Sequence, residues 1–158
     1  MRARDVMTTK LHVVMPDEPI SAAAAIMADY SVGLVPVVHD FDEMRLEGVI
    51  TDRDITVRHV APRHDESCLI RDHMTNDHLD VVHVSDHISD VISRMRYDQL
   101  RRVLVIDAGA RLVGIITQAD IARRIGRIEP VLVERLLEEM SEPVSPTQQS
   151  LVAMAMVG

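Results

Sequence analysis

Residues 46–55 spell LEGVITDRDI, and residues 112–121 repeat the pattern as LVGIITQADI at an offset of 66. Further matches lie outward from this pair in the same order along the chain, at offsets of 67 or 68. Turns absorb the drift of one or two residues, because insertions are tolerated there. The chain is therefore a duplicated unit. The outer matches are residues 5–8 with 72–75, 19–21 with 87–89, Met27 with Met95, and 37–38 with 105–106.

Each copy shows the same succession of apolar and polar patterns, which predicts the order β-α-β-β-α. The helix at 19–30 is rich in alanine, the best helix former, and the helix at 87–99 has an amphipathic stripe. The first copy is expected to contain a short helix at 2–7, a strand at 11–15, a helix at 19–30, strands at 34–38 and 46–51 around a turn at 40–43, and a helix at 52–60. The equivalents in the second copy are 69–74, 80–84, 87–99, 102–106 and 112–117 around a turn at 107–110, and 120–127.

This order predicts a mixed α/β (α+β) fold. About 60 residues per copy is marginal for independent folding, so the two copies are expected to share a buried face. The apolar end of the chain is either a disordered terminus or a strip that packs on a partner. The expected boundaries are a first domain at 1–61, a linker at 62–67 with the helix breaker Pro62, a second domain at 68–127, a C-terminal helix at 128–141 and a flexible tail at 142–158.

Composition excludes several functions. Lys and Arg number 17 and Asp and Glu number 25, for a net charge of −8, which argues against binding to nucleic-acid phosphates. The only aromatic residues of the sequence are Tyr30, Phe41 and Tyr97, too few to stack bases. The single cysteine, Cys68, permits neither an intrachain disulfide nor a multi-cysteine zinc site. No signal peptide and no apolar run of transmembrane length are seen, so we expect a cytoplasmic protein that does not bind membranes.

The repeated unit resembles the CBS domain, which is named after cystathionine β-synthase and occurs in tandem pairs called Bateman modules. The resemblance covers about residues 1–127 and is closest to stand-alone prokaryotic CBS pairs. It implies two βαββα repeats related by a pseudo-twofold axis, with two clefts between them. The matching stretches are 5–8, 35–38 and 46–55 in the first copy, and 101–107 and 112–121 in the second.

The resemblance also implies a function. Such pairs commonly bind AMP, ADP or ATP, and less often S-adenosylmethionine or NAD, and they often form homodimers. We therefore expect a regulatory sensor that passes a nucleotide signal to an unknown protein partner. The alternative is a dimeric scaffold with vestigial clefts. Patches of partly exposed apolar helix surface support a homodimer, and they are expected at Ile26, Ile55, Ile92 and Ile121.

A Thr-x-x-Asp pair at each strand-to-helix junction supplies the candidate ligand chemistry. An ionised carboxylate accepts hydrogen bonds, so Asp54 and Asp120 suit the hydroxyl groups of a ribose. The hydroxyl groups of Thr51 and Thr117, with the free N–H groups of the helix start, suit phosphate oxygens. The alternative is structural, because threonine before a helix is a common cap and aspartate in the first turn is favoured by the dipole.

Arginines distinguish the two copies. Arg53 has Ala119 as its counterpart, whereas Arg102 precedes a strand at a place where the first copy has Leu34. In nucleotide-binding relatives such as the γ subunit of AMP-activated protein kinase, a basic residue at the place of Arg102 meets phosphate. A guanidinium is a permanently charged fork for phosphate, and its alternative role is an ion pair on the surface. The asymmetry predicts two unequal clefts.

Adenine requires flat apolar walls, which valine, isoleucine, leucine and proline side chains near the junctions could provide. Each of these side chains alternatively belongs to the core. Leu104 stands where the first copy has Pro36, which changes the second cleft. The expected walls are Val14, Ile20, Val35 and Pro36 in the first copy, and Val82, Ile88, Val103 and Leu104 in the second.

Catalytic and metal chemistry are not expected. Cys68 could pair with His64 or His73 as a nucleophile, but no orienting group or oxyanion loop is readable. His83 and His87 are four residues apart across a strand-to-helix turn, so they need not share a face, and solvated histidines explain them equally well. We expect no enzyme activity, no metal site and no required cofactor.

Overall fold

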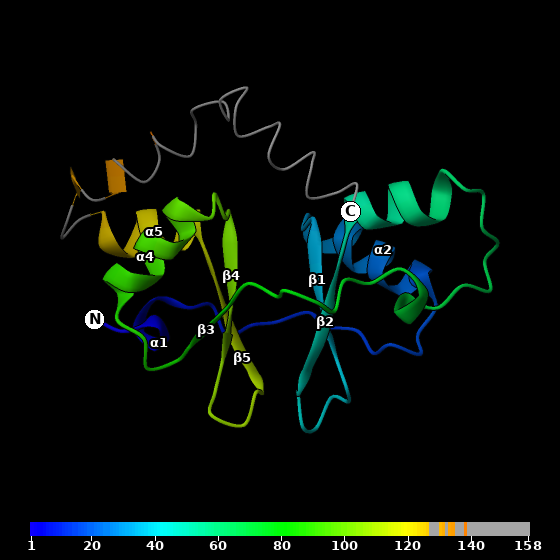
Figure 1. The fold of residues 1–158 in the computed structure, drawn as a ribbon, viewed down its shortest axis with the longest axis horizontal. Helices are drawn as coiled ribbons and strands as arrows, with labels where there is room; N and C mark the ends of the chain where they lie inside the picture. Colours follow the sequence, from blue (N-terminus) through cyan, green and yellow to red (C-terminus); the bar gives the residue numbers. More distant parts are fainter. Residues whose placement is uncertain (127–129, 132, 135–137, 139–158) are drawn as a thin grey trace.

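The protein is built from two lobes, each a small sheet covered by helices (Figure 1). The computed structural model describes residues 1–126 together with 130, 131, 133, 134 and 138. The first lobe contains α2 (Ile20–Tyr30), β1 (Leu34–Val38), β2 (Leu46–Thr51), α3 (Asp52–Asp54) and the π-helix η1 (Ile55–Val60). The second lobe contains β3 (Val81–His83), α4 (Ile88–Tyr97), β4 (Arg102–Ile106), β5 (Leu112–Thr117) and α5 (Gln118–Ile125). Two short helices open the repeats, α1 (Ala3–Val6) and the 3-10 helix η2 (Ile70–Asp72).

The two hairpins have equivalent registers. β1 pairs antiparallel with β2, and Val37 lies opposite Gly48. β4 pairs antiparallel with β5, and Val105 lies opposite Gly114. β3 adds a parallel strand beside β4. The duplication inferred from the sequence is thus confirmed in the register of the strands.

The four hairpin strands begin and end at the predicted residues, but the strand predicted at 11–15 is wrong. This segment forms a single parallel bridge at Val14. Val14 N–H donates to the Pro36 carbonyl at 3.1 Å, and Val38 N–H donates to the Val14 carbonyl at 2.9 Å. The neighbouring Leu11 and Val13 pack instead into the apolar cluster between the lobes. Leu11 and Val13, which precede Val14, are therefore held by side-chain packing rather than by strand pairing.

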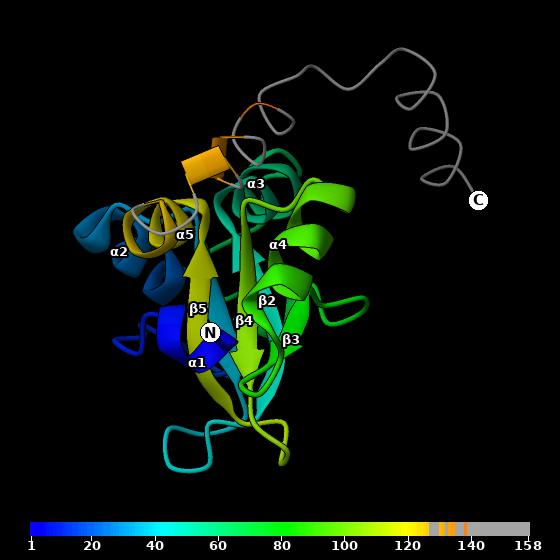
Figure 2. The ribbon, with the colours of Figure 1, turned by 90° about the vertical axis from the view of Figure 1, so that its left-hand side faces the viewer.

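The opening helix of each repeat packs in the lobe of the other repeat. Ala3 and Val6 of α1 belong to the core of the second lobe, and Ile70 of η2 belongs to the core of the first. Figure 2 shows α1 beside β5, where Thr8 N–H donates to the Ile115 carbonyl at 2.9 Å. The equivalent Thr75 N–H donates to the Val49 carbonyl at 2.8 Å. The two lobes are therefore interlocked, because each receives the opening helix of the other repeat.

Two equivalent arginines hold this exchange together. Arg58 in η1 donates to the backbone carbonyls of His73 and Met74 at 3.0 and 3.3 Å. Arg124 in α5 donates to the carbonyls of Asp5 and Met7, both at 3.2 Å. The closing helix of each repeat thus binds the end of the other repeat's opening helix.

The lobes share a buried face, as expected from the small size of each copy. Val38 from the first lobe and Leu104 and Leu112 from the second are buried together. The turns of the two hairpins are also joined. Leu46 N–H donates to the Ala110 carbonyl at 3.1 Å, and Leu112 N–H donates to the Met44 carbonyl at 2.8 Å.

The helix surfaces differ in part from the expectation. Ile26 and Ile55 are partly buried, but Ile92 and Ile121 are fully buried in the second core, so they are not part of any exposed patch. Among the described residues no helix is long and apolar enough to cross a bilayer. The predicted tail at 142–158, and most of the predicted helix at 128–141, lie outside the described residues.

Candidate functional site: a cleft between the repeats

Thr51 and Asp54 form a reciprocal helix cap at the end of β2. The Asp54 carboxylate accepts from Thr51 N–H at 3.0 Å and from the Thr51 hydroxyl at 2.8 Å. Asp54 N–H in turn donates to Thr51 Oγ1 at 3.1 Å. These bonds use Oδ2 of Asp54, whereas Oδ1 lies 3.6 Å from the Arg58 guanidinium. The structural role is therefore present, and Oδ1 lies outside the cap, in an ion pair with Arg58.

A cleft of about 490 Å³ opens beside this cap. It brings together five of the residues singled out in the sequence, three from the first repeat and two from the second. Sequence reasoning placed these residues in separate clefts, whereas the structure brings all five to the lining of one. The five residues are Thr51, Arg53, Asp54, Arg102 and Leu104.

The cleft combines both charges with apolar walls. Arg101 joins the two expected arginines, and Asp80 lies on the wall from the second repeat. Burial raises the pKa of Asp80, Arg94 opposes the rise, and Asp98 adds to it. Sequence reasoning missed Asp80, although it is the first residue of the strand predicted at 80–84, the position that Arg102 holds in the strand predicted at 102–106. The remaining lining residues are Gly33, Leu34, Val49, Asp52, Thr75, His78, Leu79, Gln99 and Leu100.

Thr117 and Asp120 repeat the cap but do not line this cleft. Asp120 accepts from Thr117 N–H at 2.9 Å and from the Thr117 hydroxyl at 2.6 Å. Its second oxygen accepts from Arg123 at 2.9 Å and from the Thr8 hydroxyl at 3.2 Å. Asp120 is only 3% exposed. Burial alone raises the pKa of Asp120, but the bonds from Thr117, Arg123 and Thr8 outweigh it and lower the pKa below the usual value.

Most of the expected adenine walls are core residues. They pack among the apolar side chains of the two lobe cores. Leu104 is the exception, since it both packs between the lobes and lines the cleft. The residues found in the cores or buried beside them are Val14, Ile20, Val35 and Pro36 in the first lobe, and Val82, Ile88 and Val103 in the second.

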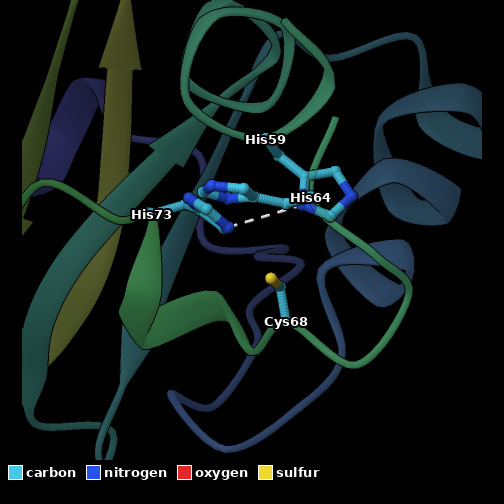
Figure 3. Close-up of side chains that lie close together, drawn as sticks. All are labelled: His59, His64, Cys68 and His73. Carbon is cyan, nitrogen blue, oxygen red and sulfur yellow. Dashed lines mark hydrogen bonds between the residues drawn. The ribbon is translucent and has the colours of Figure 1, made fainter. Parts of the chain in front are cut away.

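A second group of polar side chains gathers where the repeats join (Figure 3). His59, His64, Cys68 and His73 each offer one ligand atom, and these atoms all lie within 4.8 Å of one another. Burial, with neighbouring His59 and His64, lowers the pKa of His73. Burial, with Asp65 and Asp72, raises the pKa of the Cys68 thiol, and a thiol of raised pKa is a poor nucleophile.

Sequence reasoning considered Cys68 only with His64 or His73, and it missed His59. The signal was present as four residues of metal-ligating type, three histidines and one cysteine, within fifteen positions at intervals of five, four and five. Such intervals fit neither a helix face nor a strand face, so only the folded linker brings the four side chains together.

Comparison with known proteins identifies the class. The family model of the CBS domain matches residues 3–59 and 70–127. The chain is 37% identical over 123 residues to Hypoxic response protein 1 of Mycobacterium tuberculosis, covering 78% of this chain and 84% of that protein. This chain therefore belongs to the CBS domain family and carries two CBS repeats.

Solved structures agree with this assignment. The crystal structure of Hypoxic Response Protein I with two coordinated zinc ions has a TM-score of 0.67 and 34% identity, covering 78% of this chain and 98% of that one. CBSX2 in complex with AMP has a TM-score of 0.69 and 27% identity, covering 81% and 98%. The CBS pair of protein MJ0100 in complex with 5-methylthioadenosine and S-adenosyl-L-methionine has a TM-score of 0.65 and 26% identity, covering 80% and 97%.

Proposed function

We propose that this CBS pair is a regulatory module that binds one adenine nucleotide, AMP, ADP or ATP, in the cleft between its repeats. Binding would change the contacts of the module with a protein partner. The observation that carries the proposal is the convergence of Thr51 and Asp54 from one repeat with Arg102 from the other on a single cleft.

Each part of a nucleotide has a complementary group in this cleft. Oδ1 of Asp54 is an acceptor that suits ribose hydroxyls, because its other oxygen already serves the helix cap. Arg102 and Arg53 suit phosphate, since charge-assisted bonds from guanidinium are short and strong. Leu34 and Leu104 offer apolar surface for the base. The ligands of CBSX2 and MJ0100 support an adenosine-type compound over other small molecules.

The closed position around Asp120 supports one nucleotide rather than two. A ligand there would have to displace Arg123 and Thr8 from the buried carboxylate. Breaking hydrogen bonds to a buried charge costs about 1.5–3 kcal/mol each, so the cleft at Asp54 is favoured. This departs from the symmetric expectation that both Thr-x-x-Asp pairs bind ligand.

Isothermal titration of the full chain with AMP, ADP, ATP and S-adenosylmethionine tests the proposal. Asp54→Asn keeps the size of the side chain and an acceptor for the cap but removes the charge. We expect it to weaken binding roughly tenfold to a hundredfold, the equivalent of about 1.5–3 kcal/mol. Asp120→Asn is the matched control, because it makes the same change in an equivalent cap away from the cleft, and it should bind like the parent.

Two results would contradict the proposal. If none of the four compounds binds the parent, the clefts are vestigial. That result would support the alternative of a ligand-independent interaction protein. If Asp120→Asn loses as much affinity as Asp54→Asn, the ligand does not sit where we place it.

A further inference from the structure

We propose that His59, His64, Cys68 and His73 bind one zinc ion at the junction of the two repeats. The site is separate from the nucleotide cleft, and the inference does not depend on the proposed nucleotide binding. It stands on the chemistry of the four side chains, on their spacing in three dimensions and on the way the backbone holds them.

The donor set selects the metal. Three imidazole nitrogens and one sulfur form a mixed nitrogen and sulfur set without a carboxylate, typical of tetrahedral Zn²⁺. Mg²⁺ and Ca²⁺ prefer oxygen ligands and do not fit. Four protein ligands fill a tetrahedral shell, so the ion would be structural. On binding, Cys68 releases its thiol proton to solvent and ligates as the thiolate.

The distances have the scale of a metal site. Zn–N bonds of about 2.0–2.1 Å and Zn–S bonds of about 2.3 Å place neighbouring ligand atoms about 3.3–3.6 Å apart in a tetrahedron. His59 Nδ1 and His73 Nε2 are 3.4 Å apart, and no pair among the four ligand atoms exceeds 4.8 Å. Side-chain rotations that move the ligand atoms by about 1 Å would therefore complete the tetrahedral shell.

A hydrogen bond between two histidines does not explain the group. That bond involves only His59 and His73, whereas His64 and Cys68 also point toward the same centre (Figure 3). The ring of His64 lies 5.2 Å from that of His73, centroid to centroid. A single ion accounts for the convergence of all four side chains.

Backbone hydrogen bonds fix each of the four positions. His64 N–H donates to the His59 carbonyl at 3.0 Å, which turns the chain back directly after η1. The Cys68 carbonyl accepts from Ile20 N–H at 3.2 Å, at the start of α2. His73 N–H donates to the Ile70 carbonyl at 3.1 Å, and Arg58 holds the His73 carbonyl at 3.0 Å. The ligands are thus positioned before any ion binds, which reduces the cost of ordering them.

The burial of the ligands is graded, which gives the ion a way in. His73 is 3% exposed at the base of the group, and His64 is exposed. His59 also lines a cavity of about 410 Å³ with Glu66 and Ser21. An ion bound by all four side chains would connect η1, the segment that follows it and the end of η2. It would thereby keep η2 in the lobe of the first repeat.

Metal analysis of the purified full chain tests the inference. The metal is first removed with a chelator, Zn²⁺ is then added, and the excess is dialysed away. We expect one zinc per chain and a higher melting temperature than that of the metal-free protein. Co²⁺ used in place of zinc should give the near-ultraviolet absorption of a cobalt–thiolate bond. Cys68→Ser should abolish this band, and His64→Asn should weaken zinc binding by roughly tenfold or more.

His83→Asn is the matched control, since His83 is an exposed histidine of β3 outside the group. It should retain the zinc, the cobalt band and the increase in melting temperature. Failure of the parent to retain zinc would overturn the inference, as would a cobalt band that survives Cys68→Ser. Because His64 is exposed, His64→Asn should fold normally, so loss of metal in that variant cannot be attributed to unfolding. AMP titration of the same samples shows whether the two sites are independent.

Discussion

In the proposed function, Arg102 recognises phosphate from one repeat and Asp54 recognises ribose from the other. Arg102 begins β4 on the second repeat and is half-buried on the wall of the cleft. Asp54 lies on the first repeat, beyond the end of β2. A ligand that bridges the lobes therefore contacts two charges of opposite sign, each suited to a different chemical group.

We predict that Arg102→Ala weakens the binding of AMP, ADP and ATP but not of adenosine. The guanidinium can form charge-assisted bonds with phosphate and has no role with the base, so the loss for AMP should be about tenfold to a hundredfold. Titration of adenosine and AMP against parent and variant measures the difference. Arg111→Ala, in the hairpin turn, controls for loss of positive charge, and equal losses for adenosine and AMP would contradict a phosphate role.

At this scale the sequence singled out polar residues that the structure gathers on one cleft. Thr51 and Asp54 were singled out by the repeated Thr-x-x-Asp pattern and Arg102 by the resemblance to CBS domains, although the cap formed by Thr51 and Asp54 is also a structural reason for those two residues. Valine and isoleucine serve cores and ligand walls equally well, so Val35 and Val103 could not be assigned without the packing. The buried, hydrogen-bonded environment of Asp120 could not be predicted either, because Thr8, which donates to it, lies 112 residues away along the chain.

Strand β2 has a glycine where the other repeat crosses it. A Cβ added at Gly48 would lie 2.7 Å from the backbone carbonyl oxygen of Thr75. That segment is held by the pair of backbone bonds between Val49 and Thr75, both 2.8 Å. A side chain at residue 48 would therefore displace the segment around Thr75 that follows η2.

We predict that Gly48→Ala lowers the free energy of unfolding by about 1–3 kcal/mol, the cost typical of overpacking. Urea denaturation followed by circular dichroism measures the change. Gly109→Ala is the control, because a Cβ there would meet its nearest neighbour at an ordinary 3.4 Å. If the midpoint for Gly48→Ala equals that of the parent, the close approach of the two segments does not occur in solution.

Element boundaries followed from the sequence where the pattern is local. The hairpin strands Leu34–Val38 and Leu112–Thr117 are short apolar runs bounded by polar turns, so their ends were predictable. Residues 11–15 have the same composition, but their conformation is decided by the cluster between the lobes. The π-helical form of η1 was likewise not readable, because no periodicity distinguishes it from an α-helix over six residues.

At the scale of the whole molecule, two apolar side chains are exposed on the surface of η1. Val57 and Val60 are 50% and 59% exposed, and they lie three and six residues after the cleft residue Asp54. An interface on this surface would lie beside the nucleotide cleft, which is where a ligand could alter it.

We predict a homodimer in solution that uses the surface around Val57 and Val60. Light scattering at micromolar concentration should give about twice the monomer mass of 17.7 kDa. Val60→Asp should shift the mass toward the monomer, because burying an unpaired charge is costly. Phe41→Asp, at an equally exposed position in the β1–β2 turn, should leave the dimer intact; a monomeric parent would refute the prediction.

The exchange of opening helices also says how such a molecule could arise. A single repeat, with no second copy in its chain, would leave its own opening helix without a lobe and its lobe without a helix. Two identical chains could satisfy both needs by trading these helices, which is domain swapping in a twofold dimer. If two such chains were joined through residues 61–69, the exchange of helices between chains would become an exchange within one chain. In a single chain each copy can diverge independently, and Asp54 on the cleft and the buried Asp120 are an example of equivalent residues in different environments.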